Sequence, residues 1–199
     1  ETGISLKTDL LPETKNVFEQ KILPDTSLMQ LHQSFIVAPA TSGFLLVHQQ
    51  LAHERGLYEK FFIAAHGKKM ATQQSLFPIT LELAAADALL LQELLPDLQT
   101  LGYQLEHFGG NTWLVQGTPA DIYAGNENNS IELLLEQYKH FASEIKYSRR
   151  EKLVRCMARQ QSIKAGRSLT QKEMLALLQD LFACNTPNVS PAGNPTYIE

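Results

Sequence analysis

The stretch from Gly43 to Ala65 restricts the possible folds of this chain more than any other. Its first part, Gly43-Phe44-Leu45-Leu46-Val47, is apolar enough to form a strand, and a helical pattern begins directly after it. Apolar residues recur on one face of that helix: Leu57, Phe61, Phe62 and Ala65. A strand that runs directly into an amphipathic helix predicts a layered fold, in which helices cover a sheet.

Strand-like and helix-like segments alternate along the rest of the chain, with no internal repeat. We predict strands at 31–38, 44–47, 103–108, 112–115 and 196–198. Within 73–83 the second half alternates as a strand, whereas the first half is expected to be an exposed, extended entry to it. We predict helices at 48–65, 84–101, 129–145 and 149–165, and a last one that opens at Thr170. The segments Asn129–Glu132 and Thr170–Glu173 are typical of helix-capping boxes. The expected class is α/β, a sandwich whose early strands form a hairpin and whose sheets mix parallel and antiparallel strands.

Composition narrows the class of protein further. Apolar residues make up 44% of the 199 residues and charged residues 19%, as in an ordinary globular protein. The net charge of −4 argues against a global positive field that would recruit nucleic acid. Two cysteines are too few for a disulfide framework or a thiolate zinc cluster. No apolar run reaches the length of a membrane span and no signal peptide is visible, so we expect a cytoplasmic protein without membrane contact.

The segment from His48 to Glu59 holds two histidines and two carboxylates at the junction of a strand and a helix. Such a set is a candidate metal site, because imidazole nitrogens and carboxylate oxygens are common metal ligands. The same residues are compatible with a solvated first helical turn, where Glu54 suits the positive end of the helix. Spacing within the segment leaves both possibilities open.

Five segments, in the right order, resemble the C-terminal dimerisation domain of the DNA mismatch repair protein MutL. The segment from His48 to Arg55 is similar to the family's DQHAAHER, and the segment from Ser190 to Thr196 is similar to its CPHGRPT. The other three are 78–83, 105–111 and 162–166.

This resemblance implies a two-subdomain α/β sandwich. A split dimerisation subdomain is expected at 27–70 and 150–199, and an external, regulatory subdomain is expected as an insertion at 71–149. Residues 1–26 are polar and contain two prolines, so they are expected to be the end of a linker. The chain begins without a Met and reads as a fragment, and the linker would lead back to an N-terminal ATPase domain.

Many members of this family nick DNA with metal ions held by DQHA-x2-E-x4-E, an ACR triplet and CPHGRP. In this chain the corresponding residues are His48, Gln50, Leu51, Glu54 and Glu59, then Ala158-Arg159-Gln160, then Ser190, Ala192 and Asn194. An amide at Gln50 and a methyl group at Ala192 cannot replace imidazole ligands, and His48 brings no negative charge. The resemblance therefore implies a degenerate endonuclease site, with no metal, no catalytic residue and no enzymatic activity in this fragment.

A second motif is intact. The segment Gln73-Gln74-Ser75-Leu76-Phe77-Pro78 is similar to the Gln-x-x-Leu-x-Pro peptide by which the family engages the replication sliding clamp. Leu76 and Phe77 would fill an apolar cleft, Gln73 would form hydrogen bonds at its rim, and Pro78 would pre-order the backbone. In the alternative, the segment is an ordinary edge strand with Leu76 and Phe77 packed in the core.

The resemblance thus implies a module that joins two MutL chains as a homodimer and docks partners. Expected partners are the sliding clamp and, through the full-length protein, the mismatch-recognition protein and DNA. No cofactor is expected in this domain, since ATP and Mg²⁺ belong to the N-terminal ATPase. The alternative function is a divergent metal-dependent nicking endonuclease that uses His48, His53, Glu54 and Glu59. Candidate dimer contacts, each of which could equally be monomer core, are Phe35, Val37, Leu45, Val47, Leu177 and Leu181.

Overall fold

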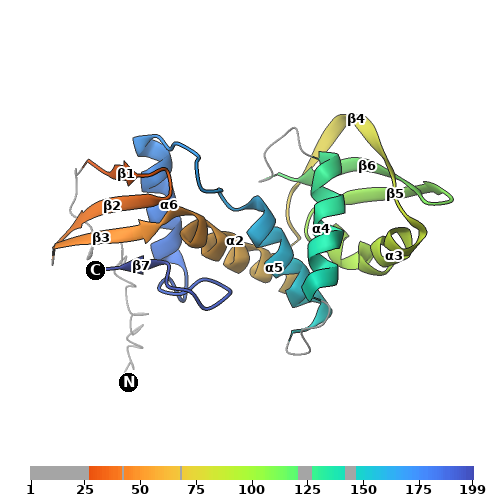
Figure 1. Ribbon diagram of the computed structural model, residues 1–199. Coiled ribbons are helices and arrows are strands. Elements are labelled where there is room, and N and C mark those ends of the chain that lie inside the picture. Colours follow the sequence, from red (N-terminus) through yellow and green to blue (C-terminus); the bar gives the residue numbers. More distant parts are fainter. Residues whose placement is uncertain (1–26, 42, 68, 121–126, 142–146) are drawn as a thin grey trace, which may run out of the picture.

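The computed structural model describes residues 27–41, 43–67, 69–120, 127–141 and 147–199, and shows two sheets with helices between them (Figure 1). The strands are β1 (Met29–Leu31), β2 (Phe35–Ala40), β3 (Gly43–His48), β4 (Thr72–Glu82), β5 (Gln104–Gly109), β6 (Thr112–Pro119) and β7 (Tyr197–Ile198). The helices are α2 (Gln49–His66), α3 (Ala85–Thr100), α4 (Glu127–Phe141), α5 (Arg149–Gln161) and α6 (Gln171–Ala183). This arrangement confirms the predicted α/β class.

The first sheet has the strand order β1-β2-β3-β7, so the last strand of the chain joins the first three. Buried and partly exposed residues alternate along β2, which gives the sheet two distinct faces. The inner face is buried against α2 and α6 in one apolar cluster. Helix α6 begins with the predicted capping box, in which Thr170 and Glu173 satisfy each other's backbone N–H groups.

The second sheet has the order β4-β6-β5 and a core of its own. Helices α3, α4 and α5 and the C-terminal half of α2 contribute to this core, with Tyr103 and Trp113 among its largest fully buried side chains. Helix α3 continues through Pro96, and the buried Asp97 that follows pairs with Arg149 (3.2 Å) and Arg150 (2.9 Å) of α5. Helices α2 and α5 pack together and connect the two sheets (Figure 1).

Four expectations from the sequence were wrong. The strand predicted at 31–38 is two strands, because His32 and Gln33 adopt left-handed φ angles of 49° and 48° and turn the chain. Both sheets are entirely antiparallel rather than mixed, since short turns join most neighbouring strands. Helix α5 ends at Gln161 instead of continuing to 165, and α4 begins at Glu127, before the predicted cap at Asn129. The linker predicted at 1–26 lies outside the described residues.

The candidate dimer residues separate into two groups. Phe35 and Val37 are only partly buried and lie on the outer face of the first sheet. The remaining four, Leu45, Val47, Leu177 and Leu181, belong to the monomer's apolar core. Among the described residues, no helix combines the length and the apolar composition that crossing a bilayer requires.

Candidate functional site

The corner between β3 and α2 is held together by His48. This residue is the N-cap of α2, and its Nδ1 accepts a hydrogen bond from the backbone N–H of Leu51 (3.4 Å). Its own backbone N–H donates to the carbonyl of Thr196 beside β7 (2.8 Å), and its ring packs edge-on against Phe35. His48 therefore has a structural role at this corner. The next candidate, Gln50, is half-buried on α2.

Gln49, which the sequence did not single out, is the most connected polar side chain of this corner. It is fully buried, and its Oε1 accepts from Gln30 (2.7 Å). Its Nε2 donates to the carbonyls of Gln33 (2.7 Å), Lys164 (3.2 Å) and Arg167 (3.3 Å). Gln49 thus ties the β1–β2 turn to the segment between α5 and α6. No local sequence signal indicates this role, because the nearest partner is 16 residues away and two of the four are more than a hundred residues away.

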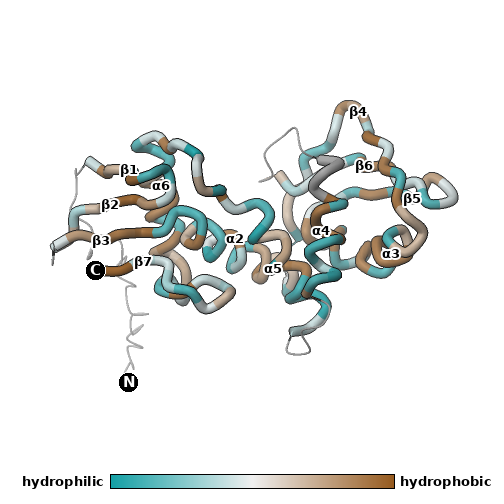
Figure 2. Tube along the Cα trace, in the orientation of Figure 1, coloured by the Kyte–Doolittle hydropathy of each residue, from teal (hydrophilic) through white to brown (hydrophobic). Residues whose placement is uncertain are grey.

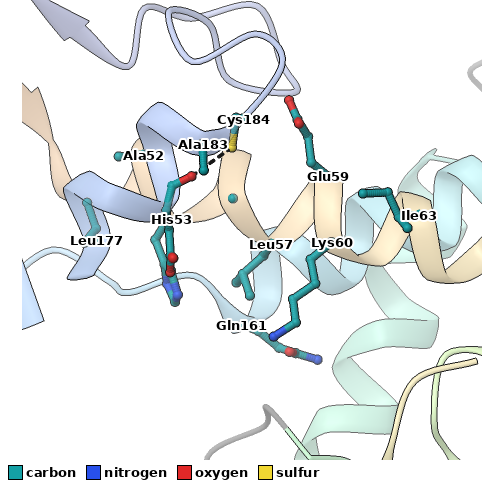
Figure 3. Close-up of a pocket in the computed structure, with 12 residues that line it drawn as sticks. Ala52, His53, Leu57, Glu59, Lys60, Ile63, Gln161, Leu177, Ala183 and Cys184 are labelled. Atoms are coloured by element: carbon teal, nitrogen blue, oxygen red, sulfur yellow. Dashed lines mark hydrogen bonds between the residues drawn. The ribbon is translucent and has the colours of Figure 1, made fainter. Parts of the chain in front are cut away.

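His53 lies one turn further along α2, at the wall of a cavity of about 550 Å³ between α2, α6 and the end of α5 (Figure 3). Its Nδ1 accepts a hydrogen bond from the backbone N–H of Ile163 (2.9 Å), which places the proton of the neutral ring on Nε2. Burial, together with the charges of Arg167, Lys164 and Lys60, lowers the pKa of His53 from 6.5 to about 4. The ring is therefore neutral at physiological pH.

Glu54 is buried, with 7% of its surface exposed. Burial raises the pKa of its carboxyl group, while the charges of Arg159, Lys164, Arg155 and Arg55 act in the opposite direction. The charge of Glu54 is thus balanced by cations of the chain itself.

Glu59, the second retained acid, accepts hydrogen bonds from the backbone of the tail that follows α6. Its Oε2 accepts from the backbone N–H (2.8 Å) and the side-chain amide (3.1 Å) of Asn185, and its Oε1 accepts from the N–H of Thr186 (3.3 Å). Arg55 lies on its other side at 3.8 Å. Glu59 therefore fixes the start of the tail that follows α6. Figure 3 shows it pointing toward that tail, away from His53.

The tail loop around Ser190 is closed by a short bridge between Val189 and Pro195. Ser190 is buried, and its Oγ accepts a hydrogen bond from the N–H of Asn194 (3.1 Å). Ala192 and the side chain of Asn194 are exposed. Arg55 and Arg155 pin this loop by donating to the carbonyls of Val189 (2.6 Å) and Pro191 (2.5 Å). Two arginines thus hold the loop against α2 and α5.

The segment Gln73–Pro78 forms a bulge in β4. Four residues, 75 to 78, lie opposite the single residue Gln116 of β6, so the bulge projects from the sheet. Leu76 is 91% and Phe77 81% exposed, which overturns the alternative that they pack in the core. Ser75 Oγ donates to the carbonyl of Phe77 (2.7 Å) and closes the bulge locally.

Gly117 makes the base of this bulge possible. A Cβ atom at this position would lie 2.6 Å from Cγ2 of Thr72 and 3.0 Å from the carbonyl oxygen of Gln73. Only a glycine lets β6 approach β4 this closely.

Comparison with known proteins supplies the deciding observation. The family described as the MutL C terminal dimerisation domain matches residues 28–169. The chain belongs to this family.

Curated relatives of the chain point to the same family. The DNA mismatch repair protein MutL of Chlorobium phaeobacteroides is 33% identical over 88% of this chain and 28% of its own length. The corresponding protein of Chloroherpeton thalassium is 36% identical over 85% of this chain and 27% of its own length. That of Flavobacterium johnsoniae is 35% identical over 85% and 26%. The chain therefore spans little more than a quarter of the length of these relatives.

Membership of the MutL family raises the question of a metal centre. Within the described ranges, no group of three or more His, Cys, Asp or Glu side chains could hold a metal ion. Glu54 is surrounded by cations, Glu59 is occupied by backbone N–H groups, and His48 and His53 both accept hydrogen bonds through Nδ1. These donors do not fit a two-metal site, which needs several anionic or imidazole ligands around ions about 4 Å apart.

Proposed function

We propose that this chain is the homodimerisation and partner-docking module of a MutL mismatch repair protein, and that it dimerises through the outer face of the first sheet. The observation that carries this proposal is the apolar character of that face. Cross-strand partners build three rows on it: Met29, Val37, Leu46 and Ile198; Leu31, Phe35 and His48; Pro39 and Phe44.

Exposure supports an interface on this face. Met29 and Ile198, at the two ends of the first row, and Phe44, in the third row, are 57–60% exposed, and no described element covers this face. Hydrophobic colour extends along β2 and β3 in Figure 2. A contiguous apolar face of this kind marks an interaction site, and the same face on two copies can pair about a two-fold axis. His48 is the single ionisable side chain in the three rows, so pairing buries little charge.

Sedimentation of a Val37→Lys variant tests this interface. The wild-type chain is expected to sediment at twice its own mass at micromolar concentration, and the variant as a folded monomer, because the lysine places a charge in the apolar centre. Leu89→Lys is the matched control, since Leu89 is apolar and 64% exposed but lies on α3. A wild-type monomer, or a dimeric Val37→Lys variant, contradicts the proposal.

The length of the relatives supports a larger assembly. We assign residues 27–70 and 150–199 to the dimerisation subdomain and 71–149 to the inserted external subdomain, in keeping with the two sheets. The C-terminal half of α2 and helix α5 belong to the first of these by sequence but pack in the core of the second sheet, so they join the two subdomains. In the full-length protein, residues 1–26 lead to an ATPase domain that uses ATP and Mg²⁺. The dimer holds two such arms together in the cytoplasm, where they meet the mismatch-recognition protein and DNA.

The bulge of β4 is proposed as the docking peptide for the sliding clamp. Leu76 and Phe77 are available for an apolar cleft without any unfolding of the sheet, because both side chains already project into solvent. Gln73 is exposed beside them for a hydrogen bond at the rim, and Pro78 limits the backbone freedom lost on binding.

A clamp pull-down tests this docking peptide. The double variant Leu76→Ser with Phe77→Ser is expected to lose clamp binding while its dimer and thermal stability stay unchanged. Phe108→Ser is the control, because Phe108 is 70% exposed on β5 outside the bulge. Clamp binding by the double variant contradicts the assignment.

The endonuclease site is proposed to be inactive, on the strength of the misfit between the residues present and a two-metal centre. Supercoiled plasmid incubated with the full-length protein and Mn²⁺ should stay intact. If nicking occurs and disappears in Glu54→Ala, the divergent endonuclease is the correct function instead.

A further inference from the structure

A small cavity lies between the first turns of α3 and the turn that joins β5 to β6, at the end of the molecule opposite the first sheet (Figure 1). Its volume is about 230 Å³. Helix α3 lines it with Ala85, Leu89 and Gln92, and the hairpin lines it with His107 and Trp113. All of these except Trp113 are exposed, so a ligand can enter from solvent.

The indole N–H of Trp113 has no hydrogen-bond partner in the part of the chain that the structure describes. Trp113 is 2% exposed, and the exposed His107 ring packs edge-on against it, with 5.1 Å between the ring centroids. A buried donor without a partner costs free energy, because folding has removed its hydrogen bond to water. A ligand that brings an acceptor into the cavity recovers that loss.

The surface around the cavity is acidic. Residues 71–120 contain five Asp and Glu residues and not one Lys or Arg. Two of these acids are paired with Lys or Arg residues from outside the stretch. The other three, Glu82, Glu93 and Glu106, are exposed and form no ion pair within the described residues. Glu93 lies one helical turn beyond Leu89, beside the cavity. The local field therefore favours a cationic ligand.

We propose that this cavity binds a short, basic segment of a partner protein in extended conformation. One apolar side chain of the segment enters the space beside Leu89. The peptide carbonyl next to that side chain accepts a hydrogen bond from Trp113 when the exposed His107 ring moves aside. Lysine or arginine side chains that flank it reach Glu82 and Glu93.

A peptide fits the cavity better than a carboxylate ligand does. The volume suits one side chain of moderate size, and the unpartnered indole requires an acceptor beside it. A backbone carbonyl is an acceptor without a negative charge, which the surrounding glutamates would repel. Ala84 leaves α3 without a side-chain cap, and the positive end of a helix would favour an acidic ligand instead. The charge of the preferred ligand is therefore the decisive measurement.

This site goes beyond the proposed clamp peptide and uses different residues. The bulge at Gln73–Pro78 presents its side chains to a cleft of the partner, whereas the cavity receives a side chain of the partner. Neither the bulge nor the first sheet contributes a residue to the cavity lining. Binding at the cavity, clamp docking and dimerisation can therefore be measured separately.

Trp113 is the one tryptophan of the sequence, so its indole N–H reports on the cavity directly. A nitrogen–proton NMR correlation spectrum of the isotope-labelled chain contains one indole cross-peak. The probe is a capped heptapeptide with valine at its centre, an alanine on either side and two lysines at each end. Titration with this peptide should move the indole peak downfield to a plateau, because the proton gains an acceptor. Added salt should weaken the binding, since opposite charges contribute to it.

Variants of the chain and of the peptide locate the contact. Ala85→Phe fills the mouth of the cavity and should weaken binding at least tenfold, or by about 1.4 kcal/mol. Ala86→Phe is the matched control, because Ala86 is exposed on the same turn but does not line the cavity, and it should change affinity less than about twofold. Glu82→Gln with Glu93→Gln should weaken binding and reduce its dependence on salt. Exchanging the central valine for glycine should weaken binding at least as much as Ala85→Phe does.

Several results overturn the proposal. An indole peak that stays in place up to about 1 mM peptide shows that the donor is not used. Tighter binding of the same peptide with glutamates in place of lysines indicates an acidic ligand at the end of α3. Equal losses in Ala85→Phe and Ala86→Phe place the peptide elsewhere on the acidic surface. The double variant Leu76→Ser with Phe77→Ser should bind the peptide as the wild type does, and a loss there assigns the binding to the bulge instead.

Discussion

Replacing His53 by Asn should remove a defined part of the acid sensitivity of this domain. In the folded chain the His53 ring is partly buried and neutral, and it accepts a hydrogen bond from Ile163 N–H through Nδ1. Asn preserves an acceptor at nearly the same position as Nδ1, but it does not titrate. The substitution therefore isolates the protonation of His53 from its packing.

The size and sign of the effect follow from the pKa. The folded-state pKa is about 4 and the ordinary value is 6.5, so between these pH values the unfolded chain binds the proton more tightly. The stability that this group contributes is complete above pH 6.5 and is lost as the pH falls toward 4. The gap between the two pKa values corresponds to about 3 kcal/mol. Arg167, Lys164 and Lys60 surround the ring, whereas Glu59 and Asp180 line the same cavity.

Urea denaturation at several pH values measures this contribution. Wild type and His53→Asn are compared at one protein concentration, because unfolding of a dimer depends on it. The free energy of unfolding of the wild type should fall by about 3 kcal/mol more than that of the variant between pH 7 and pH 4. Other groups titrate in both proteins and cancel in the difference. Curves that stay parallel within about 0.5 kcal/mol would refute the argument that burial keeps His53 neutral.

Two further substitutions probe contacts that the fold depends on, each with a matched control measured by urea denaturation. Gly117→Ala should cost about 1–3 kcal/mol because its methyl group would press on β4, whereas Gly67→Ala meets open space and should cost under about 0.5 kcal/mol. Gln49→Ala removes four buried hydrogen bonds and should cost about 2–3 kcal/mol, whereas the adjacent Gln50→Ala should be nearly neutral. Equal costs within either pair would contradict the packing described for it.

The sequence correctly predicted those helices and strands that depend on residues close together in the chain. The capping box at Thr170 and Glu173 opens α6 where expected, and the apolar run before His48 forms β3 and leads directly into α2. The turn at His32 and Gln33 was missed, because neither residue is a glycine and left-handed φ angles are uncommon in residues other than glycine.

Contacts between residues far apart in the sequence determine features of the structure that the local sequence pattern could not predict. Residues up to 165 have a helical pattern, yet α5 ends at Gln161, and Gln49 accommodates the carbonyl of Lys164 in the irregular segment that follows. The candidate site, likewise, could be predicted only in part from the sequence. Substituted metal ligands can be recognised from their identity, but the gathering of Arg55, Arg155 and Lys164 around one carboxylate requires the fold.

The two retained acids do not by themselves argue for metal chemistry, because each has a structural reason to remain. Glu59 accepts three hydrogen bonds from Asn185 and Thr186, and its loss would leave those N–H groups without a partner and release the tail that returns to β3. Glu54 is a carboxylate amid four cations, and an uncharged residue there would leave those cations to repel one another. Both acids of the segment His48–Glu59 therefore have structural roles, Glu59 at the start of the tail and Glu54 among four cations.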